Sequence, residues 1–598
     1  MSLHYAKRSL NFFWEHSKKW LATSVILTIF KGVAPIISLW LTKELINSIT
    51  SNLQTNNSDY MQVFLLLCAQ FLLSIIVASL QKIQQYMDRH EITKLSLKLN
   101  QLYLRKTTTV PLNAFDDPEL HNYVNRLQGD KGESFLSPYQ DLLEVCKSVI
   151  TIFSFLIFLL SFHWALFILS IISALPIYFV QSKFGNKKFE LIKSQTTNLR
   201  EMNYINYLLS DRHSAKEIRI YELGAYFINR WSSIFSMNAV RRLNLFRKQQ
   251  ISEVGAEGVT SLLYMLSALI IIWLASETTI QIGDFVAIGQ AVQGTQNMIN
   301  QAAFSLARIY EKSLYIKDYF EFIDFEFGNN DLVPRVEEFP IPLKKGIRFR
   351  NVTFRYSNNT KVILNDISFS IRHGEKIAIV GENGSGKSTL VKCLMGLYPI
   401  TSGKIYFDNV DAELITHASL RKNITAIFQD FSKYPFSVKD NIVFGDIERA
   451  TDTFLIKKVA CATGVDEFVG KFENGYETIL GNFLEKGEDL SGGQWQKIAL
   501  SRALYRDCQI LILDEPTAAL DPKSEKDVYM GFEKIAKNKT TIFITHRMST
   551  ARLADRIFVM KNGRIIEEGS HDELMLLEKE YYRMYKMQTH WYSSNKVF

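Results

Sequence analysis

One short stretch of this chain reads Gly381-Glu382-Asn383-Gly384-Ser385-Gly386-Lys387-Ser388-Thr389. It matches the pattern G-x-x-x-x-G-K-[ST], in which glycines let a loop turn its backbone N–H groups inward around a phosphate chain. An apolar strand is predicted before the loop, over Lys376–Val380, and a helix after it, over Leu390–Leu397. The N-terminus of that helix adds the positive end of its dipole to the loop. The sequence therefore predicts a nucleotide-phosphate site within an α/β domain.

The side chains of this loop suit the same purpose. Lys387 is expected to reach the β- and γ-phosphates, and the hydroxyl of Ser388 is expected to be a ligand of Mg²⁺. Further along, the continuous apolar run Ile510–Leu513 is typical of a strand buried on both faces of a parallel sheet. The run ends in Asp514, a second candidate ligand of Mg²⁺, and in Glu515, which we expect to orient or deprotonate the attacking water.

Two more features complete the predicted chemistry. His546 follows the apolar strand Thr541–Ile544, where it can bond the γ-phosphate and steady Glu515. The sequence Leu490-Ser491-Gly492-Gly493-Gln494 precedes the helical run Trp495–Leu504, which makes a second helix N-terminus suited to phosphate. One chain with two such helix starts indicates a sandwich of two subunits, each completing the site of the other.

Composition limits the class of protein. A chain of 598 residues is too long for one ordinary core, so two or more domains are expected. The net charge of +8 comes from 69 Lys and Arg against 61 Asp and Glu, which is too balanced to indicate a nucleic-acid partner. The five cysteines are odd in number and scattered, which argues against a disulfide framework or a zinc site.

The first half of the chain carries long runs without charged residues. A helix needs about 20 residues to cross the hydrocarbon core of a membrane. Six crossings are predicted, centred near residues 20–42, 60–81, 140–161, 164–182, 258–276 and 285–307. The third and fourth form a hairpin that turns near Ser161–Trp164. Buried helices of a large soluble protein are the alternative, which six such runs argue against.

The loop charges orient these crossings. Lys and Arg are abundant before the first crossing and in the segments 82–137 and 183–250, whereas 48–59, 161–164 and 276–284 contain neither. The positive-inside rule then places both termini and both long loops in the cytoplasm. The long loops read as helical, so crossings two to five are expected to continue beyond the membrane. No cleavable signal peptide is visible at the N-terminus.

Polar residues interrupt two of the crossings. Lys31 lies in the middle of the first, where a charge is costly unless it faces a wet cavity or a partner. The last crossing carries a polar stripe at steps of three and four, formed by Gln290, Gln293, Asn297 and either Asn300 or Gln301. A water-filled translocation pathway would accept this stripe, and so would hydrogen bonding between subunits.

A linker separates the two halves. Residues 328–345 contain acidic side chains and three prolines, and from Ile347 short strand-like runs alternate with helical stretches. We therefore expect a transmembrane domain over 1–327, the linker over 328–345, a nucleotide-binding domain over 346–585 and a tail over 586–598.

Taken in order, these motifs resemble those of ATP-binding-cassette (ABC) exporter half-transporters over nearly the whole chain. The resemblance implies the following assignments: Tyr356 as the aromatic that stacks on adenine, Gly381–Thr389 as the Walker A loop, Gln429 as the Q-loop residue that senses Mg²⁺, Leu490–Gln494 as the signature, Ile510–Glu515 as Walker B, Ala519-Leu520-Asp521 as the D-loop and His546 as the switch. Glu485 resembles a residue of the exporter-type X-loop. The implied fold is a six-helix transmembrane domain followed by an α/β P-loop ATPase domain.

The resemblance also implies a mechanism. ATP, with Mg²⁺ held by Ser388, Gln429 and Asp514, would be hydrolysed at two composite sites of a dimer, and hydrolysis would drive alternating access of the membrane domains. Because no motif is degenerate, a homodimer of this chain would have two competent sites. Ala114–Leu127 and Ser214–Trp231 are candidate coupling segments, with solvated loop helices as the alternative.

Three finer stretches resemble exporters of lanthipeptides and related ribosomal peptides: 428–434, 216–221 and 490–500. This resemblance implies a peptide cargo, a bacterial plasma membrane with its lipid, and peptide-modifying enzymes as further partners. No N-terminal peptidase domain is expected, since the first crossing begins near residue 20. A multidrug or lipid exporter is the nearest alternative. A non-transport ATPase is disfavoured by the six crossings, and an importer subunit by the fused domains with the membrane part first.

Overall fold

A computed structural model describes residues 3–55, 60–116, 120, 123–124, 127, 129–173, 175–212, 214–277, 281–325, 335–356, 361–450, 452–483, 487–515 and 539–593. The chain forms two compact units. The first comprises Met1–Thr109 and Pro118–Phe325, and the second comprises Val110–Asp117 and Glu326–Phe598. The short segment Val110–Asp117 thus belongs to the second unit, although the sequence of the first surrounds it.

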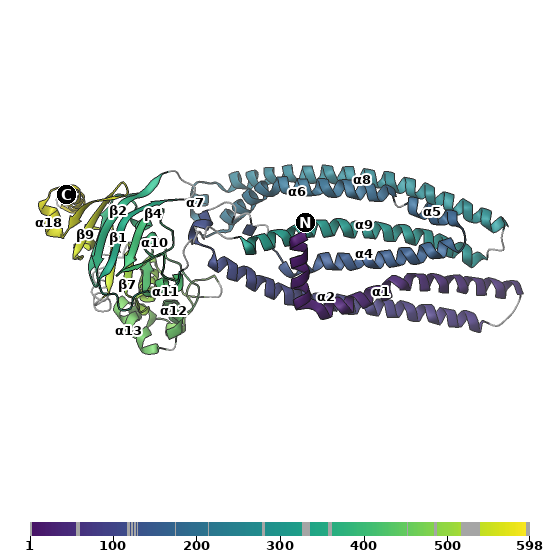
Figure 1. Cartoon of the computed structure of the whole chain (residues 1–598), viewed down its shortest axis with the longest axis horizontal. Helices are drawn as coiled ribbons and strands as arrows, with labels where there is room; N and C mark the ends of the chain where they lie inside the picture. Colours follow the sequence, from purple (N-terminus) through teal and green to yellow (C-terminus); the bar gives the residue numbers. More distant parts are fainter. Residues whose placement is uncertain are drawn as a thin grey trace. The chain divides into compact units, whose positions relative to one another are not determined.

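The first unit is built from long helices (Figure 1). They are α1 (Leu3–Thr55), α2 (Met61–Thr109), α4 (Lys131–Leu160), α5 (Trp164–Ile172), α6 (Leu175–Ser210), α7 (Ala215–Ile220), α8 (Gly224–Glu277) and α9 (Ile282–Asp324). Helix α1 is kinked at Ser17, whose φ and ψ are −134° and 20°. Helix α2 contains neither Gly nor Pro, which favours a single helix over its 49 residues.

Helix α9 packs along α4 and also against α1, while α6 lies beside α8 (Figure 1). Small residues allow this close approach: a Cβ added to Gly294 of α9 would lie 2.5 Å from the ring of Phe155 in α4. A Cβ added to Gly283 would lie 2.4 Å from the Lys43 carbonyl oxygen of α1. The packed faces bury an apolar cluster that includes Leu159 and Ile288.

Five helical stretches among the described residues are long and apolar enough to cross a membrane: Lys7–Gln54, Met61–Thr109, Lys131–Leu160, Trp164–Gly185 and Gly224–Trp273. They overlap the first five predicted crossings. The sixth, 285–307, lies in α9 but is not among these stretches, because its Gln and Asn side chains lower its hydropathy. Its crossing therefore stays a prediction.

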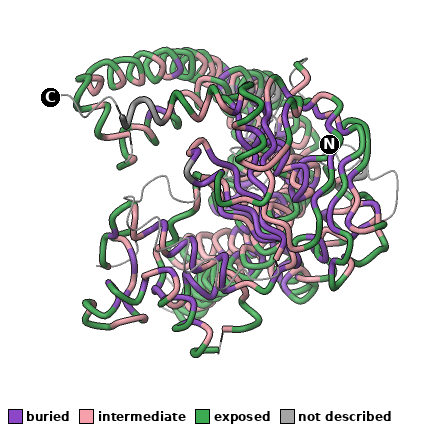
Figure 2. The backbone as a smooth tube through the Cα atoms, turned by 90° about the vertical axis from the view of Figure 1, so that its left-hand side faces the viewer, coloured by how far each residue is buried: buried purple, intermediate pink, exposed green. Residues whose placement is uncertain are grey.

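Many large apolar side chains on these helices are exposed, including Phe64 and Phe71 of α2 and Phe153 of α4. Figure 2 shows long runs of exposed residues along the helical part of the chain. In water such surface would be unfavourable, whereas hydrocarbon accepts it without cost. The exposed apolar faces are those expected of a membrane domain.

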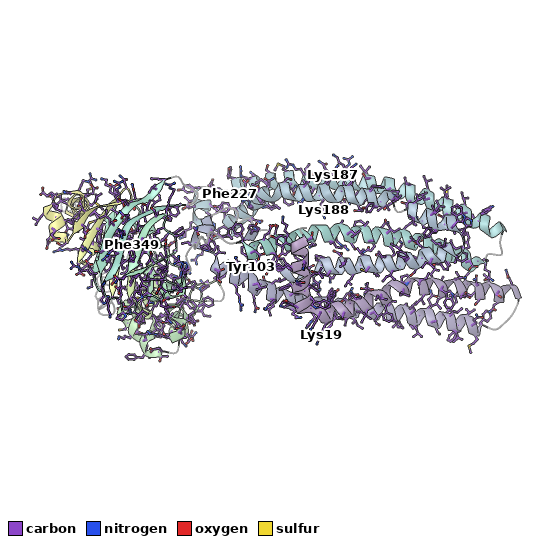
Figure 3. All side chains as sticks on the ribbon, in the orientation of Figure 1. Lys19, Tyr103, Lys187, Lys188, Phe227 and Phe349 are labelled. Atoms are coloured by element: carbon purple, nitrogen blue, oxygen red, sulfur yellow. The ribbon has the colours of Figure 1, made fainter. Side chains whose placement is uncertain are left out.

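The predicted hairpin turn is confirmed. Helix α4 ends at Leu160 and α5 begins at Trp164, with His163 as the N-cap whose Nδ1 accepts from the Ala165 N–H at 3.1 Å. The expected extension of the helices is also seen, since α2, α6 and α8 continue far past their apolar parts. Lys187 and Lys188 lie on such a polar part of α6 (Figure 3).

The second unit contains two sheets. A four-stranded antiparallel sheet has the order β2-β1-β4-β5, formed by β1 (Gly346–Arg355), β2 (Val362–Arg372), β4 (Ser402–Phe407) and β5 (Val410–Asp411). Phe349 of β1 (Figure 3) faces Phe369 of β2, and their rings stack with centroids 4.5 Å apart. Aromatic pairs across neighbouring strands fix the register of such a sheet.

The other sheet has six strands in the order β10-β9-β3-β8-β7-β6. Its members are β3 (Lys376–Gly381), β6 (Ile424–Ile427), β7 (Ile510–Asp514), β8 (Thr540–Ile544), β9 (Arg556–Lys561) and β10 (Arg564–Gly569). All neighbours are parallel except β10, which pairs antiparallel with β9. The apolar run of β7 is buried along four of its five residues, as predicted for a central parallel strand.

Helices surround this sheet. They are α10 (Lys387–Leu394), α11 (His417–Asn423), α12 (Val438–Val443), α13 (Thr453–Thr463), α14 (Asp466–Val469), α15 (Gly492–Tyr505), α17 (Met548–Ala551), α18 (His571–Leu576) and α19 (Glu580–Ser593), with 3-10 turns at Ile447–Arg449 and Gly475–Glu477. A further 3-10 turn, Leu112–Asp116, comes between α2 and α4 in the chain. The structure differs from the predicted linker and from the predicted tail. The second half of the expected linker packs on this unit, where Phe339 and Leu343 are buried. The expected tail from residue 586 begins inside α19.

Candidate functional site

The predicted site residues gather at one edge of the six-stranded sheet. The order β3-β8-β7-β6 makes four parallel strands direct neighbours. The glycine-rich loop follows β3, His546 follows β8, Asp514 and Glu515 end β7, and Gln429 follows β6. Because parallel strands end at the same edge, ligands of such sheets bind there. Four segments that are distant in sequence therefore meet.

The loop is shaped by its glycines. Gly384 and Gly386 have φ of +78° and +105°, in the left-handed region that other residues adopt only with strain. A Cβ added to Gly381 would lie 2.2 Å from the Met560 carbonyl oxygen of the neighbouring strand β9. Gly386 is also the N-cap of α10. The glycines are thus required for the loop to reach the helix start.

Lys387 is buried within the loop. Its Nζ donates to the carbonyl oxygens of Gly381 and Glu382, each at 2.9 Å. Burial lowers the pKa of this amine from its usual value, while Glu515 and Asp514 act in the opposite direction. A buried cation in a glycine-rich loop that leads into a helix N-terminus is suited to bind a phosphate chain.

The loop borders a cavity of about 620 Å³. Its lining consists of Tyr356, Ile363, Asn383, Gly384, Gly386, Lys387, Ser388, Thr389, Gln429, Asp514, Glu515, Ile544 and His546. The Tyr356 hydroxyl and Thr389 Oγ1 lie 3.2 Å apart, which places the predicted adenine-stacking ring at the loop. Ser385 Oγ is buried and has no hydrogen-bond partner among the described residues, a feature that fits a loop awaiting a polar ligand.

Glu515 lies between two other predicted residues. Its Oε2 accepts from Gln429 Nε2 at 2.9 Å, and its Oε1 lies 3.1 Å from His546 Nε2. The backbone of Glu515 has φ of +46°, an unusual value for a residue with a side chain, and its N–H donates to the Ile544 carbonyl oxygen at 2.9 Å. A non-glycine residue held in this region is often found at a functional site.

The pKa values of two residues at this edge of the sheet are shifted. Burial raises the pKa of Asp514 above its usual value, and the hydrogen bond from Ser388 opposes that rise. Burial and the nearby Lys387 cation lower the pKa of His546, while Glu515 acts in the opposite direction. A His with a lowered pKa is neutral at pH 7, so its ring can donate one proton and accept another.

Side chains with oxygen atoms that could bind Mg²⁺ lie together where the metal site was predicted. The Ser388 hydroxyl is hydrogen-bonded to the Asp514 carboxylate, and Gln429 lines the same cavity. Hydroxyl, carboxylate and amide oxygens are the ligands that Mg²⁺ prefers, together with phosphate oxygens. Within the described ranges, no cluster of three or more His, Cys, Asp and Glu side chains could hold a metal alone. The residues fit a magnesium ion bound jointly with phosphate.

The second predicted phosphate-binding helix start is formed as expected. Ser491 is the N-cap of α15, and its side chain forms a reciprocal capping box with Gln494. Ser491 and Gly492 are exposed, and neither they nor Gly493 and Gln494 line the cavity of their own chain. The structure therefore does not bring the two helix starts together within one chain.

Asp521 of the predicted D-loop and Glu485 of the predicted X-loop lie outside the described residues. Sequence reasoning missed Ile363 and Ile544, which supply apolar lining. Ile544 could have been found from its place at the end of the strand before His546. No sequence pattern indicates that Ile363 lines the cavity, because this residue belongs to β2 of the four-stranded sheet.

The membrane unit has a polar cavity of its own, of about 540 Å³. Lys31 lines this cavity, as predicted from the free-energy cost of placing a charge in a membrane. The Lys31 Nζ donates to Gln84 Oε1 at 2.5 Å. Of the predicted stripe, Gln301 lines this cavity, whereas Gln290, Gln293 and Asn297 are exposed and Asn300 is half-buried. Sequence reasoning missed the stripe on α4, formed by Gln140, Glu144, Lys147 and Thr151 at helical spacing.

Comparison with known proteins agrees with this geometry. Residues 364–518 match the ABC transporter family, and residues 21–296 match the ABC transporter transmembrane region. The chain belongs to the ABC transporter family: it is an ABC exporter, with an ATP-binding domain whose ATPase activity is coupled to transport.

Particular relatives narrow the comparison. The chain is 31% identical to the subtilin transport ATP-binding protein SpaT of Bacillus subtilis, over 92% of this chain and 88% of that protein. It is 28% identical to the nisin transport ATP-binding protein NisT of Lactococcus lactis subsp. lactis, over 96% and 95% of the two chains. Lipid A-core flippases of several bacteria and a putative multidrug export protein of Bacillus subtilis also match, at 27–30% identity.

Among solved structures, a bacterial Atm1-family ABC exporter with ATP bound aligns with a TM-score of 0.80. The alignment covers 96% of this chain and 98% of that one, at 22% sequence identity. At this identity the likeness establishes the exporter fold, with its transmembrane domain followed by the nucleotide-binding domain.

Proposed function

We propose that two copies of this chain form a homodimer that exports a ribosomally made, modified peptide of the lanthipeptide type across a bacterial plasma membrane. The observation that carries the cargo class is the similarity to the subtilin and nisin transport proteins over nearly the full length of each chain. Energy comes from ATP hydrolysis, the activity of the family.

In the proposed reaction, the N–H groups of the Gly381–Thr389 loop and the Lys387 amine bind the phosphate chain of ATP, and Tyr356 stacks on adenine. Ser388, Asp514 and Gln429 would hold Mg²⁺, which would neutralise part of the phosphate charge. Glu515 accepts a proton from the attacking water. The contact between His546 and Glu515 supports this role, since it holds the carboxylate in place.

The proposed dimer supplies what one chain does not bring together. The exposed Ser491–Gln494 helix start, and Asp521 of the D-loop, would complete the cavity of the partner. The support is that the Ser491 end of α15 is open to solvent and lies outside the cavity of its own chain. Two equal composite sites follow from this arrangement.

The proposed pathway for cargo runs through the membrane unit. Lys31, Gln301 and the polar face of α4 support it, because side chains of this kind are tolerated at membrane depth only where water or a polar partner reaches them. In the proposed topology both termini and both long loops lie in the cytoplasm, which their Lys and Arg content supports. Coupling would use the loop tips near Ala114–Leu127 and Ser214–Trp231.

A multidrug or lipid exporter is the second candidate, favoured by the matches to lipid A-core flippases and a putative multidrug protein. The two candidates are tested by reconstituting the purified chain in liposomes and measuring MgATP hydrolysis. A modified peptide with its leader is expected to stimulate hydrolysis in a saturable way, while a hydrophobic dye or lipid A added at the same concentration is not. Stimulation by the dye or lipid A alone would overturn the peptide assignment. Peptide-modifying enzymes are proposed partners, testable by co-purification.

A further inference from the structure

The C-terminal helix α19 contacts the segment that carries His546. Gln588 is the contact residue: its Nε2 donates to the His546 carbonyl oxygen, and its Oε1 accepts from the Met548 N–H at 3.0 Å. The two bonds hold the peptide groups on either side of Arg547. One side-chain amide thereby constrains the backbone both at His546 and two residues further on.

The segment needs such a constraint because it belongs to no helix or strand. Residues 545–547 connect the end of β8 to the start of α17. This connection is also held by hydrogen bonds from the Arg547 N–H to Thr545 Oγ1, at 2.9 Å, from Thr545 Oγ1 to the Arg547 carbonyl oxygen, at 3.4 Å, and from the Thr545 N–H to the Ile379 carbonyl oxygen, at 3.4 Å. Where no ladder holds the backbone, side-chain bonds fix its peptide planes.

Helix α19 is firmly anchored, so it can act as a support. The Glu567 carboxylate of β10 accepts from the N–H groups of Glu580 and Tyr581, at 2.7 and 3.1 Å, and so caps the helix. Tyr581 is fully buried, and its hydroxyl lies 2.8 Å from His571 Nδ1. Two helical turns, about 10 Å, separate this anchor from Gln588.

We propose that Gln588 is a positioning residue for ATP hydrolysis: it fixes the backbone of 545–547 and, through it, the ring of His546 against Glu515. The effect on chemistry runs through geometry, since the His546 ring meets Glu515 at 3.1 Å and a displacement of about 1 Å would break that contact. Gln588 does not line the cavity that holds Glu515 and His546. The inference rests on the role proposed above for His546.

The first test is Gln588→Leu, which keeps the size of the side chain and removes both hydrogen bonds. We expect kcat for MgATP to fall about tenfold with KM within about twofold, because the loss affects alignment rather than nucleotide binding. Gln588→Glu keeps the oxygen that accepts from the Met548 N–H and loses the N–H that donates to the His546 carbonyl oxygen. Its kcat is expected to lie between those of the wild type and Gln588→Leu. Met587→Ala, on the same helix at an exposed position, is the matched control and should match the wild type.

The second test separates positioning from general stability. In a His546→Ala background, measured by single-turnover hydrolysis over long times, adding Gln588→Leu should cause no further fall in the rate, because the residue through which it acts is gone. A full additional fall there would overturn the proposal, as would an unchanged kcat in the single variant. A rise in KM equal to the fall in kcat would also overturn it.

A failure of the proposal for Gln588 can be distinguished from a failure of the proposed catalytic role of Glu515. Glu515→Gln tests the catalytic site directly. If that variant is inactive while Gln588→Leu turns over normally, the positioning role fails and the catalytic assignment stands. If Glu515→Gln hydrolyses ATP normally, the proposed catalytic role of Glu515 fails first.

Discussion

The imidazole Nε2 of His546 lies 3.1 Å from a carboxylate oxygen of Glu515, and the two residues follow neighbouring parallel strands, β8 and β7. The second oxygen of Glu515 accepts from Gln429, which follows the next strand, β6. Both carboxylate oxygens are therefore fixed by groups that the sheet itself positions. A general base held from both sides can meet a water molecule in one orientation.

Replacing Glu515 by Gln should nearly abolish turnover while ATP stays bound. The amide keeps the shape of the side chain but does not accept a proton, and a general base typically contributes 10²–10⁴-fold to rate. Hydrolysis and retention of labelled ATP are measured on the same preparation. Unchanged hydrolysis would remove Glu515 from its proposed role.

Hydrolysis should decrease at acid pH as His546 becomes protonated. Burial and Lys387 lower its pKa below the ordinary value of 6.5, so the ring is neutral at pH 7 and gains its proton only at a pH below 6.5. Because the unfolded chain binds this proton at a higher pH than the folded chain does, stability also falls with decreasing pH through this range. The pH–rate profile is compared with that of His546→Gln, in which the acid limb assigned to His546 should be missing. An identical limb in both proteins would contradict the assignment.

Replacing Ser491 by Arg should lower turnover at least tenfold, since it blocks a helix start that would bind phosphate across the dimer. Nucleotide affinity of the loop in the same chain should stay within about twofold, because Ser491 is not part of that cavity. Hydrolysis and binding of a fluorescent ATP analogue are the two measurements. Equal loss of both would place Ser491 in the site of its own chain.

Cysteines at Lys31 and Gln301 should react with a membrane-impermeant thiol reagent in at least one nucleotide state, in a protein without its native cysteines. The expectation follows from the polar cavity that both residues line. Phe71→Cys is the matched control on an exposed apolar face, where lipid should protect it. Labelling at Phe71 and at neither of the other two positions would reject the pathway.

Much of the ATP-binding unit could be predicted from the sequence, because each motif there lies next to a strand or helix whose pattern is local. The loop before α10, the end of β7 and the start of α15 are examples, with helix starts displaced by about one turn from prediction. The contact between Gln588 and the backbone at His546 could not be predicted, since a single Gln in a C-terminal helix carries no pattern. Packing of α19 beside α17 brings the two together.

The membrane unit was predictable to a different extent. Apolar runs located the crossings, but hydropathy does not tell which face of one helix meets another. Thus Lys31 was expected in a cavity, whereas the polar residues of α4 that share that cavity were missed, although Gln140, Glu144 and Lys147 follow helical spacing. The rotation of α4 and α9 about their axes decides which polar side chains meet.

Transport itself tests the central claim most directly. Inside-out membrane vesicles containing the protein would be given a labelled, modified peptide with its leader, with and without ATP. The account predicts ATP-dependent accumulation of the peptide inside vesicles with the wild-type chain and none with Glu515→Gln. Accumulation of a hydrophobic dye or a lipid, with no accumulation of peptide, would contradict it.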